Sequence, residues 1–194
     1  MKEIDEPGVN FIYQSGVTQL LGFIVEKATG GENSAIMYPA NYGLRCTPRK
    51  APFGASTGRT AWKKAYCCFN SNARDFARFG QLLLNNGQWD DRQLISPAYL
   101  AEATSPDTRL VYKDLGKPNH CYGFQYWILD YKGMKIPYMR GILGQYVFTL
   151  PEKNAVIVRL GHKRSDTYTA DQPLSGRYKI HGWTRRWTYF NKNL

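Results

Sequence analysis

The residues that could carry chemistry in this chain do not form the common catalytic motifs. The three histidines, His120, His162 and His181, have neither HExxH spacing nor the Cys/His spacing of a zinc site, so no metal site is predicted. The sequence contains no GxxxxGK[ST] loop and no GxGxxG after a predicted strand. No serine stands three residues before a lysine, so the Ser-x-x-Lys nucleophile pair is also absent. Candidate functional residues must therefore be identified from the predicted helices and strands that would position them.

The positive charge of the chain is concentrated in two tracts. The 194 residues carry 26 Lys and Arg against 15 Asp and Glu, and this net charge of +11 would ordinarily suggest a nucleic acid or an anionic surface as partner. Residues 33–63 and 173–194 hold 10 of the basic residues and no acidic one, which leaves 16 basic residues against 15 acidic residues elsewhere. Most of the chain thus has the charge balance of an ordinary globular protein.

Composition excludes several classes of protein. Hydrophobic residues make up 43% and aromatic residues 14% of the chain, enough for a folded core and too much for a disordered protein. No apolar run approaches the roughly 20 residues of a membrane span, and the first six residues do not resemble a signal peptide. The four cysteines, Cys46, Cys67, Cys68 and Cys121, lack the spacing of a disulfide framework and are predicted to be small buried residues.

Three segments in the first part of the chain have the periodicity of helices. The first covers 16–29, where Gly30-Gly31 provides a stop in the left-handed conformation. Its apolar stripe consists of Val17, Leu20, Leu21, Ile24, Val25 and Ala28. The second is capped by Ser71 or Asn72, runs to Leu84 and is ended by 85–87; the third follows Ser96-Pro97 over 98–103. Residues 33–63 have no periodicity and are predicted to be a long irregular segment.

The pattern changes to that of β-strands from Tyr122 onward. Residues 122–130, 142–150 and 155–160 are rich in aromatic and β-branched side chains, and 151–154 is predicted to be the turn of an antiparallel hairpin between the last two. Helices therefore come first and a β meander follows. This order favours an α+β fold over a doubly wound parallel sheet.

Several motifs, in the same order along the chain, resemble those of serine β-lactamase-like hydrolases. The matching stretches are PGVNFIYQSG at 7–16 with LLG at 20–22, NARDFARFGQLLL at 72–84, LISP at 94–97, YGFQYW at 122–127, RGILGQY at 140–146 and PE at 151–152. This family includes class C β-lactamases, D-Ala-D-Ala carboxypeptidases, esterases and 6-aminohexanoate-dimer hydrolases. The resemblance covers 7–31 and 64–162 and implies the C-terminal portion of a penicillin-binding-protein-like (DD-peptidase) fold.

The resemblance implies catalytic roles for two residues near the N-terminus. Tyr13 aligns with the tyrosine that moves a proton between the nucleophilic serine, the lysine and the leaving group. A phenol has a pKa of about 10, so such a tyrosine needs a nearby cation to act near neutral pH. Ser15 aligns with the third residue of the same motif, which orients the substrate amide or the lysine. Judged by its residue type alone, Tyr13 would instead be an aromatic side chain packed at a strand edge.

The resemblance also implies a substrate-binding segment at 139–144. Met139-Arg140-Gly141 stands where the family has Lys/His-Thr/Ser-Gly, so recognition of a penicillin carboxylate is not expected. Arg-Gly-Ile-x-Gly-Gln is closer to the 6-aminohexanoate-dimer hydrolase and esterase branch. There the backbone N–H after the glycine, here that of Ile142, would be one donor of the oxyanion hole. Gly144 would let the strand pass close to the substrate or would mark a bulge.

A shifted reading frame would explain why the resemblance is lost in both basic tracts. Codons built from the last base of one codon and the first two of the next allow 53–64 to encode WSLDRKDGMEK directly before AYCC, as the family resemblance leads us to expect. The same operation on 182–190 allows MDAALDIL, which is similar to the last helix of the family. We therefore predict that both tracts are out of frame and that Met1 is an internal methionine of a longer gene.

The sequence thus predicts the C-terminal portion, over 1–172, of a hydrolase followed by an irregular basic tail at 173–194. By resemblance, the family reaction is acyl transfer from a small-molecule amide or ester through an acyl-serine, without metal or organic cofactor. Because the nucleophile pair is missing, this chain alone is predicted to be inactive. The resemblance implies a periplasmic or secreted protein, although no signal peptide is present here. The alternatives are a basic nucleic-acid-binding protein, which we do not favour, and a non-catalytic protein that retains the ligand-binding cleft.

Overall fold

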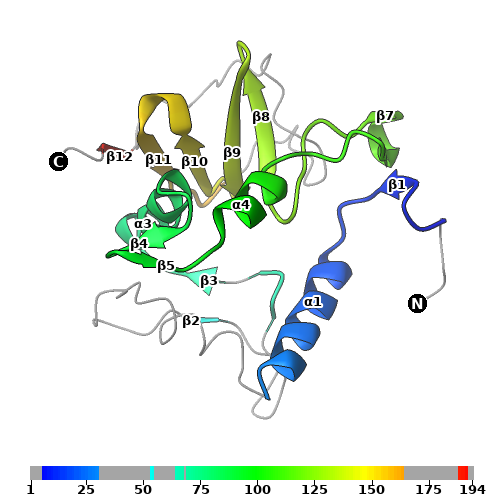
Figure 1. The fold of residues 1–194 in the computed structure, drawn as a ribbon, viewed down its shortest axis with the longest axis horizontal. Coiled ribbons are helices and arrows are strands. Elements are labelled where there is room, and N and C mark those ends of the chain that lie inside the picture. The colour runs from blue at the N-terminus through cyan, green and yellow to red at the C-terminus, as the bar shows by residue number, and fades with distance from the viewer. Residues whose placement is uncertain (1–5, 31–52, 55–63, 68, 164–187, 192–194) are drawn as a thin grey trace. The chain divides into compact units, whose positions relative to one another are not determined.

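A computed structural model describes residues 6–30, 53–54, 64–67, 69–163 and 188–191 (Figure 1). The chain divides into two compact units, Tyr13–Asp75 and the combination of Met1–Ile12 with Phe76–Leu194. Most of the two basic tracts, 33–63 and 173–194, and the parts of the frame-shift hypothesis that fall on them lie outside the described residues. Within these tracts, Phe53–Gly54 and Thr188–Asn191 form short strands, although both tracts were expected to be irregular.

The unit Tyr13–Asp75 contains the first helix and a small antiparallel pair. Helix α1 spans Ser15–Ala28, and the glycine at position 30 has a φ of +74°, so the predicted helix and its stop are confirmed. Strands β2 (Phe53–Gly54) and β3 (Phe69–Asn70) pair antiparallel. The apolar stripe of α1 was expected to face a core, but no residue of this helix is buried.

Helix α3 (Ala73–Leu84) begins with a well-satisfied cap. Asn72 Oδ1 accepts a hydrogen bond from the Asp75 N–H at 3.0 Å, and the Asp75 carboxylate accepts from Asn72 Nδ2 at 2.7 Å and from Ser71 Oγ at 2.6 Å. These reciprocal bonds satisfy donors that an uncapped helix would leave exposed. Of the two predicted candidates, Asn72 is therefore the residue that caps the backbone, while Ser71 holds the carboxylate of Asp75.

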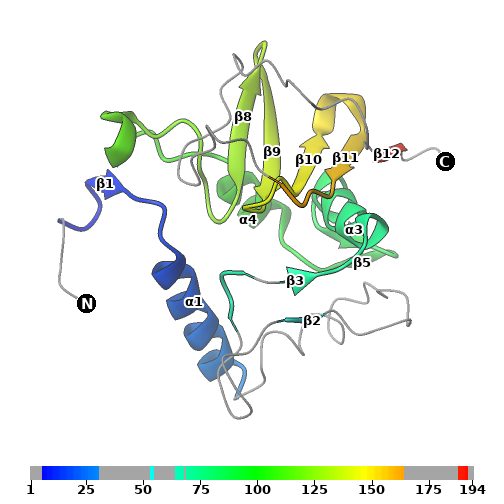
Figure 2. The same cartoon turned by 180° about the vertical axis from the view of Figure 1, so that it is seen from behind.

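The larger unit is built on a five-stranded antiparallel sheet with the order β12-β11-β10-β9-β8 (Figures 1 and 2). Its strands are β8 (Trp127–Tyr131), β9 (Met134–Arg140), β10 (Tyr146–Leu150), β11 (Ala155–Arg159) and β12 (Thr188–Asn191). The predicted β10–β11 hairpin is confirmed, with its turn formed by the 3-10 helix Pro151–Lys153 and Asn154. Strand β9 was not predicted. The order of helices followed by an antiparallel sheet confirms the α+β class.

Short elements complete this unit. Strands β1 (Asn10–Phe11) and β7 (Lys117–Pro118) flank β6 (Val111–Tyr112), and the 3-10 helix Lys113–Leu115 joins β6 to β7. Strands β4 (Gln88–Trp89) and β5 (Arg92–Gln93) form a hairpin. Helix α4 (Pro97–Ala103) starts as predicted at Ser96, whose side chain accepts from the Tyr99 N–H.

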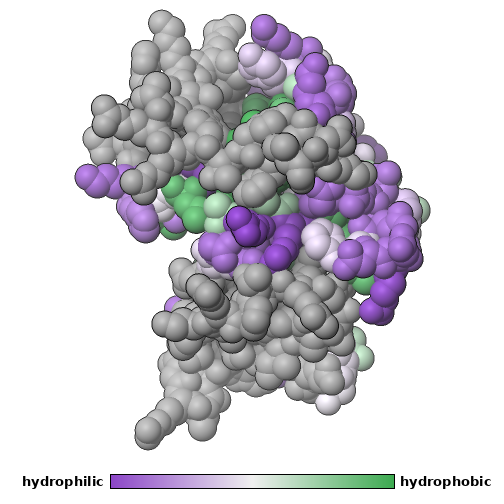
Figure 3. Space-filling model, turned by 90° about the vertical axis from the view of Figure 1, so that its left-hand side faces the viewer, coloured by the Kyte–Doolittle hydropathy of each residue, from purple (hydrophilic) through white to green (hydrophobic). Residues whose placement is uncertain are grey.

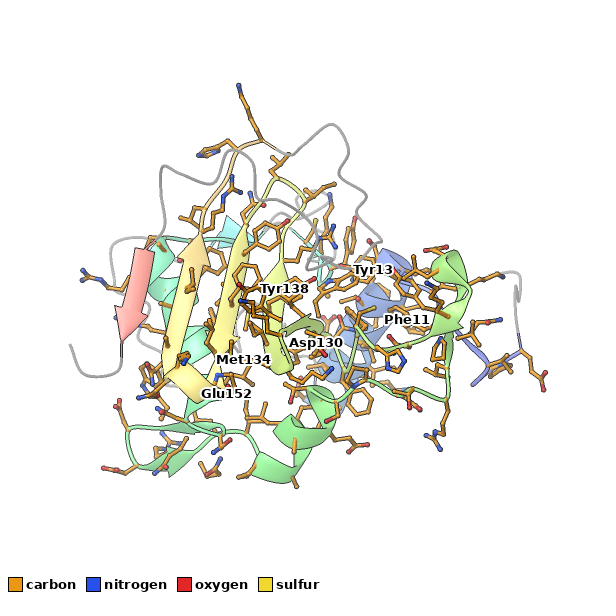
Figure 4. All side chains as sticks on the ribbon, turned by 90° about the horizontal axis from the view of Figure 1, so that it is seen from above. Phe11, Tyr13, Asp130, Met134, Tyr138 and Glu152 are labelled. Carbon is orange, nitrogen blue, oxygen red and sulfur yellow. The ribbon has the colours of Figure 1, made fainter. Side chains whose placement is uncertain are left out.

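The two faces of the large sheet have different side chains. On one face, Gly80 of α3 approaches Val147 of β10 and Val156 of β11, which brings the helix backbone close to the strands. On the other face, Tyr138, which is labelled in Figure 4, forms an aromatic cluster with Tyr146 and Phe148, and the Tyr138 and Phe148 ring centroids are 5.2 Å apart. All five of these non-glycine side chains are buried, so the core of this unit lies on both sides of the sheet.

On the face shown in Figure 3, hydrophilic side chains predominate and apolar side chains gather in a few places between them. Among the helices that the structure describes, none has the length and apolar character needed to cross a membrane.

The thiol of Cys121 is predicted to make stability depend on pH. Cys121 is buried beside Asn119, and burial raises the pKa of its thiol to about 11 from an ordinary value of 9.0. The thiol therefore ionises more readily in the unfolded chain, so its contribution to stability is complete below pH 9 and is lost as the pH rises toward 11. We expect the urea midpoint of the wild type to fall over this range more steeply than that of Cys121→Ala. Parallel curves for the two proteins would contradict this.

Candidate active site

The connection between β9 and β10 is a tight turn over residues 141–145. The Gly141 N–H donates to the Gln145 carbonyl at 2.8 Å, and the Gly144 N–H donates to the Gly141 carbonyl at 3.2 Å. Gly144 has a φ of +82°, whereas Ile142 and Leu143 do not have positive φ. This is the pattern of a type I turn followed by a left-handed glycine, a common way to connect antiparallel strands.

One backbone N–H of this turn takes no part in its internal hydrogen bonds. The N–H groups of Gly141 and Gly144 donate to carbonyls of the turn, and the Leu143 N–H donates to Gln145 Oε1 at 3.0 Å. Among residues 141–144, only the N–H of Ile142 has no acceptor within the described part of the chain. Ile142 is also exposed. The turn therefore offers one oriented donor to an external oxygen atom.

Two polar side chains hold the turn in place. Gln145 donates through Nε2 to the Gly161 carbonyl at 2.7 Å while its Oε1 accepts from the turn, and Arg159 of β11 donates to the Gly144 carbonyl. The side chain of Gln145 lies so close to Gly141 that a Cβ there would be 2.6 Å from Gln145 Oε1. The turn is thus fixed from both sides, as a preorganised donor requires.

The structure changes the interpretation of two predicted residues. Ile142 was expected within a strand over 142–150, but β10 begins at Tyr146, so Ile142 lies in the turn. Gly144 was expected to permit close passage of a substrate or to mark a bulge. Its positive φ and the side chain of Arg159, which lies where a Cβ would be, are sufficient to require glycine here.

Arg140 precedes the turn and is held by an aromatic ring. Its guanidinium lies over the ring of Trp127, 5.1 Å from the ring centroid, and Arg140 pairs with Tyr146 across the β9–β10 ladder. A cation held in this way is attracted by the electron-rich face of the indole. The residue before Gly141 is therefore a positioned cation on the strand that leads into the turn.

Tyr13 and Ser15 belong to the unit Tyr13–Asp75. Tyr13 is half-buried and lies in the extended segment just before α1, at the end of the blue helix in Figure 4. Ser15 is exposed and is the first residue of α1. The remaining predicted residues, Gly141, Ile142 and Gly144, lie together in the β9–β10 turn of the other unit. Three of the five predicted site residues therefore lie together in one turn. The other two, Tyr13 and Ser15, belong to the other unit.

Sequence reasoning gave no role to Gln145 or Arg159. Gln145 was visible in the Arg-Gly-Ile-x-Gly-Gln motif, and its position directly after the turn glycine was the signal that could have identified it. Arg159 lies 15 residues after Gly144, so nothing local in the sequence connects the two. In the described residues, no group of three His, Cys, Asp or Glu side chains is arranged to hold a metal ion.

The arrangement of these helices and strands is that of the β-lactamase and penicillin-binding-protein-like fold. The chain is similar to a solved structure from Bacillus anthracis described as a 6-aminohexanoate-dimer hydrolase, with 28% identity and a TM-score of 0.67 over 82% of this chain and 40% of that one. It is also similar to a structure from Bacteroides dorei DSM 17855 described as a beta-lactamase, with 20% identity and a TM-score of 0.60 over 88% of this chain and 57% of that one.

No protein-family model and no curated protein matches this sequence. This chain is thus similar to proteins of the serine β-lactamase-like family over part of their length. It spans about two fifths of the length of the first of these proteins and less than two thirds of the second.

Proposed function

We propose that this chain supplies one part of the active site of a serine hydrolase that cleaves amide or ester bonds of a small molecule. In this proposal the nucleophilic serine and its lysine come from polypeptide outside the chain, because the sequence has no Ser-x-x-Lys pair. The chain alone is then inactive, and its contribution is to stabilise charge, move a proton and orient the substrate. The proposal also places the complete protein in the periplasm or outside the cell, as the family resemblance implies.

The observation that carries the proposal is the N–H of Ile142 in the fixed β9–β10 turn. When a serine oxygen attacks an acyl carbon, the carbonyl oxygen gains negative charge and needs hydrogen-bond donors that are already oriented. The N–H of Ile142 has no acceptor in the described part of the chain, while its neighbours Gly141, Leu143 and Gly144 all donate within the turn. This arrangement supports Ile142 as one oxyanion donor, with Gly141 and Gly144 required for the shape of the turn.

The roles of the remaining residues follow from the family motif. Tyr13 would transfer a proton between the attacking serine and the leaving group, as a general acid and base. Ser15, exposed at the start of α1, would bind the substrate amide. Arg140 is directed onto Trp127, and the chain has no Lys-Thr-Gly triplet at this position. These features favour a linear amide or ester over a penicillin, in keeping with the description of the Bacillus anthracis protein.

Removing a single backbone N–H tests this proposal. The test protein is a fusion in which this chain replaces the matched portion of the Bacillus anthracis protein. Ile142 occupies the second position of a type I turn, where proline is readily accepted. Ile142→Pro therefore deletes the donor while preserving the turn, and we expect kcat for a p-nitrophenyl ester to fall about 10²- to 10³-fold.

The matched control is Ile142→Ala, which removes the side chain but keeps the N–H. We expect this variant to retain kcat within a few-fold of the fusion that carries isoleucine. If the proline and alanine variants lose activity equally, the N–H is not an oxyanion donor. If neither variant loses activity, the turn is not part of the active site.

A further inference from the structure

Helix α1 exposes the side that its sequence makes apolar. The residues at spacings i, i+3, i+4, i+7 and i+8 from Val17 form one continuous stripe along the helix. Leu20 and Ile24, at the centre of this stripe, have exposed fractions of 54% and 55%. Val17, Leu21 and Val25, which complete it, are also exposed. We call these five residues the α1 stripe.

The opposite side of the same helix contacts Ala65, a described residue of the same unit. Gln19 Oε1 accepts a hydrogen bond from the Ala65 N–H at 3.0 Å, and a Cβ at Gly22 would lie 2.6 Å from the Ala65 Cβ. Thr18, Gln19, Gly22 and Glu26 are all less exposed than the α1 stripe. An amphipathic helix of a globular protein ordinarily does the reverse, with its apolar side buried and its polar side in water.

The exposed stripe is too apolar to be an ordinary surface. Burying a leucine, isoleucine or valine side chain contributes about 1.5 to 3 kcal/mol relative to leaving it in water. Five adjacent side chains of this kind therefore give a strong driving force for covering the helix, and contiguous apolar patches of this type mark interaction surfaces. No charged residue interrupts the stripe, so its partner must be apolar at the same place.

We propose that the α1 stripe is the docking surface for a polypeptide that supplies the rest of the β-lactamase-like fold. The argument for this partner is the extent of the structural matches: this chain covers 40% of the Bacillus anthracis protein and 57% of the Bacteroides dorei protein. In both cases a large part of the folded chain has no counterpart here. This inference rests on the shared fold and does not require the proposed hydrolysis.

The test is co-expression of the full chain with the part of the Bacillus anthracis protein that it does not match. The complex is isolated through a tag on this chain, and its stoichiometry and dissociation constant are measured. We expect a one-to-one complex, and we expect Leu20→Glu and Ile24→Glu each to weaken it about 100-fold or more, because a charge would be buried at an apolar contact. Leu20→Met and Ile24→Val keep the apolar surface and should bind like the wild type.

A second measurement locates the contact without relying on the variants. Hydrogen exchange of the α1 amides should slow when the complementing polypeptide is bound. Absence of a complex with the wild-type chain, or a complex that tolerates both glutamate variants, would overturn the proposal. A homodimer or binding to phosphatidylcholine–phosphatidylglycerol vesicles that is lost in Leu20→Glu would also overturn it, because the stripe would then serve a second copy or a lipid surface. Since these readouts are independent of activity, failed docking is distinguishable from failed catalysis.

Discussion

Replacement of Tyr13 by phenylalanine in the fusion protein is expected to lower kcat for an amide or ester substrate about 10²- to 10⁴-fold. This is the usual contribution of a positioned general acid or base, and phenylalanine removes only the hydroxyl that would carry the proton. The KM for the substrate should change little, because the ring is retained. Steady-state kinetics with a p-nitrophenyl ester measures both parameters.

The control for this variant is Tyr66→Phe. Tyr66 belongs to the same unit and has an exposed side chain, so loss of its hydroxyl should leave kcat unchanged. Similar losses of kcat in both variants would indicate a general effect on the fold. An active Tyr13→Phe protein would show that proton transfer in this enzyme does not pass through Tyr13.

Replacement of Gly80 by alanine is expected to destabilise the larger unit by about 1 to 3 kcal/mol, and Gly80→Val should cost more. A Cβ at this position would lie 2.9 Å from one methyl carbon of Val156, still closer to the other, and 3.3 Å from a methyl carbon of Val147. These atoms belong to the packed sheet, so the helix must move away from β10 and β11. Urea unfolding followed by tryptophan fluorescence measures the change.

A glycine in helix α1 provides the matched control, because its replacement by alanine should not destabilise the protein. Gly16 lies in α1 and has open space where a Cβ would be placed. Gly16→Ala should therefore be neutral or stabilise the chain by up to about 1 kcal/mol through helix propensity. Equal destabilisation by both substitutions would mean that Gly80 is not a point of close helix–sheet contact.

The helices could be predicted from the sequence because their signals are local. Asn72, Ser96 and Gly30 mark helix ends through their own hydrogen-bonding or conformational properties, and the structure places the ends where these residues stand. What local patterns could not predict is which side of α1 is covered. That depends on packing partners distant in the sequence, and here the polar side contacts Ala65 while the apolar side is exposed.

Strand β9 was missed because it has no alternating pattern. Ile136, Pro137 and Tyr138 are consecutive and all buried, and a proline ordinarily argues against a strand. The ladder explains why it is tolerated: β10 pairs with β9 only from Tyr138 onward, so Pro137 is paired on one side only, with Ile128 of β8. Because β9 was not predicted, the next strand was predicted to begin at Ile142. The turn that contains Ile142 was therefore not predicted either.

The candidate site could be predicted in part. The motif around Arg140 to Gln145 indicated a substrate-binding segment, but only the folded turn shows that its other N–H groups donate internally while the N–H of Ile142 has no acceptor among the described residues. The support from Arg159 depends on the pairing of β10 with β11. The Cys67 side chain, predicted to be a buried thiol, is disulfide-bonded, which its spacing did not indicate.

The central claim is that this chain carries an incomplete hydrolase site, and the hydrolysis of a p-nitrophenyl ester tests it most directly. The rate is measured for the chain alone and for its fusion with the unmatched part of the Bacillus anthracis protein. We expect the chain alone to be no faster than buffer, and the fusion to show turnover that Ile142→Pro reduces about 10²- to 10³-fold. Turnover by the isolated chain, or a folded fusion without turnover, would contradict the account.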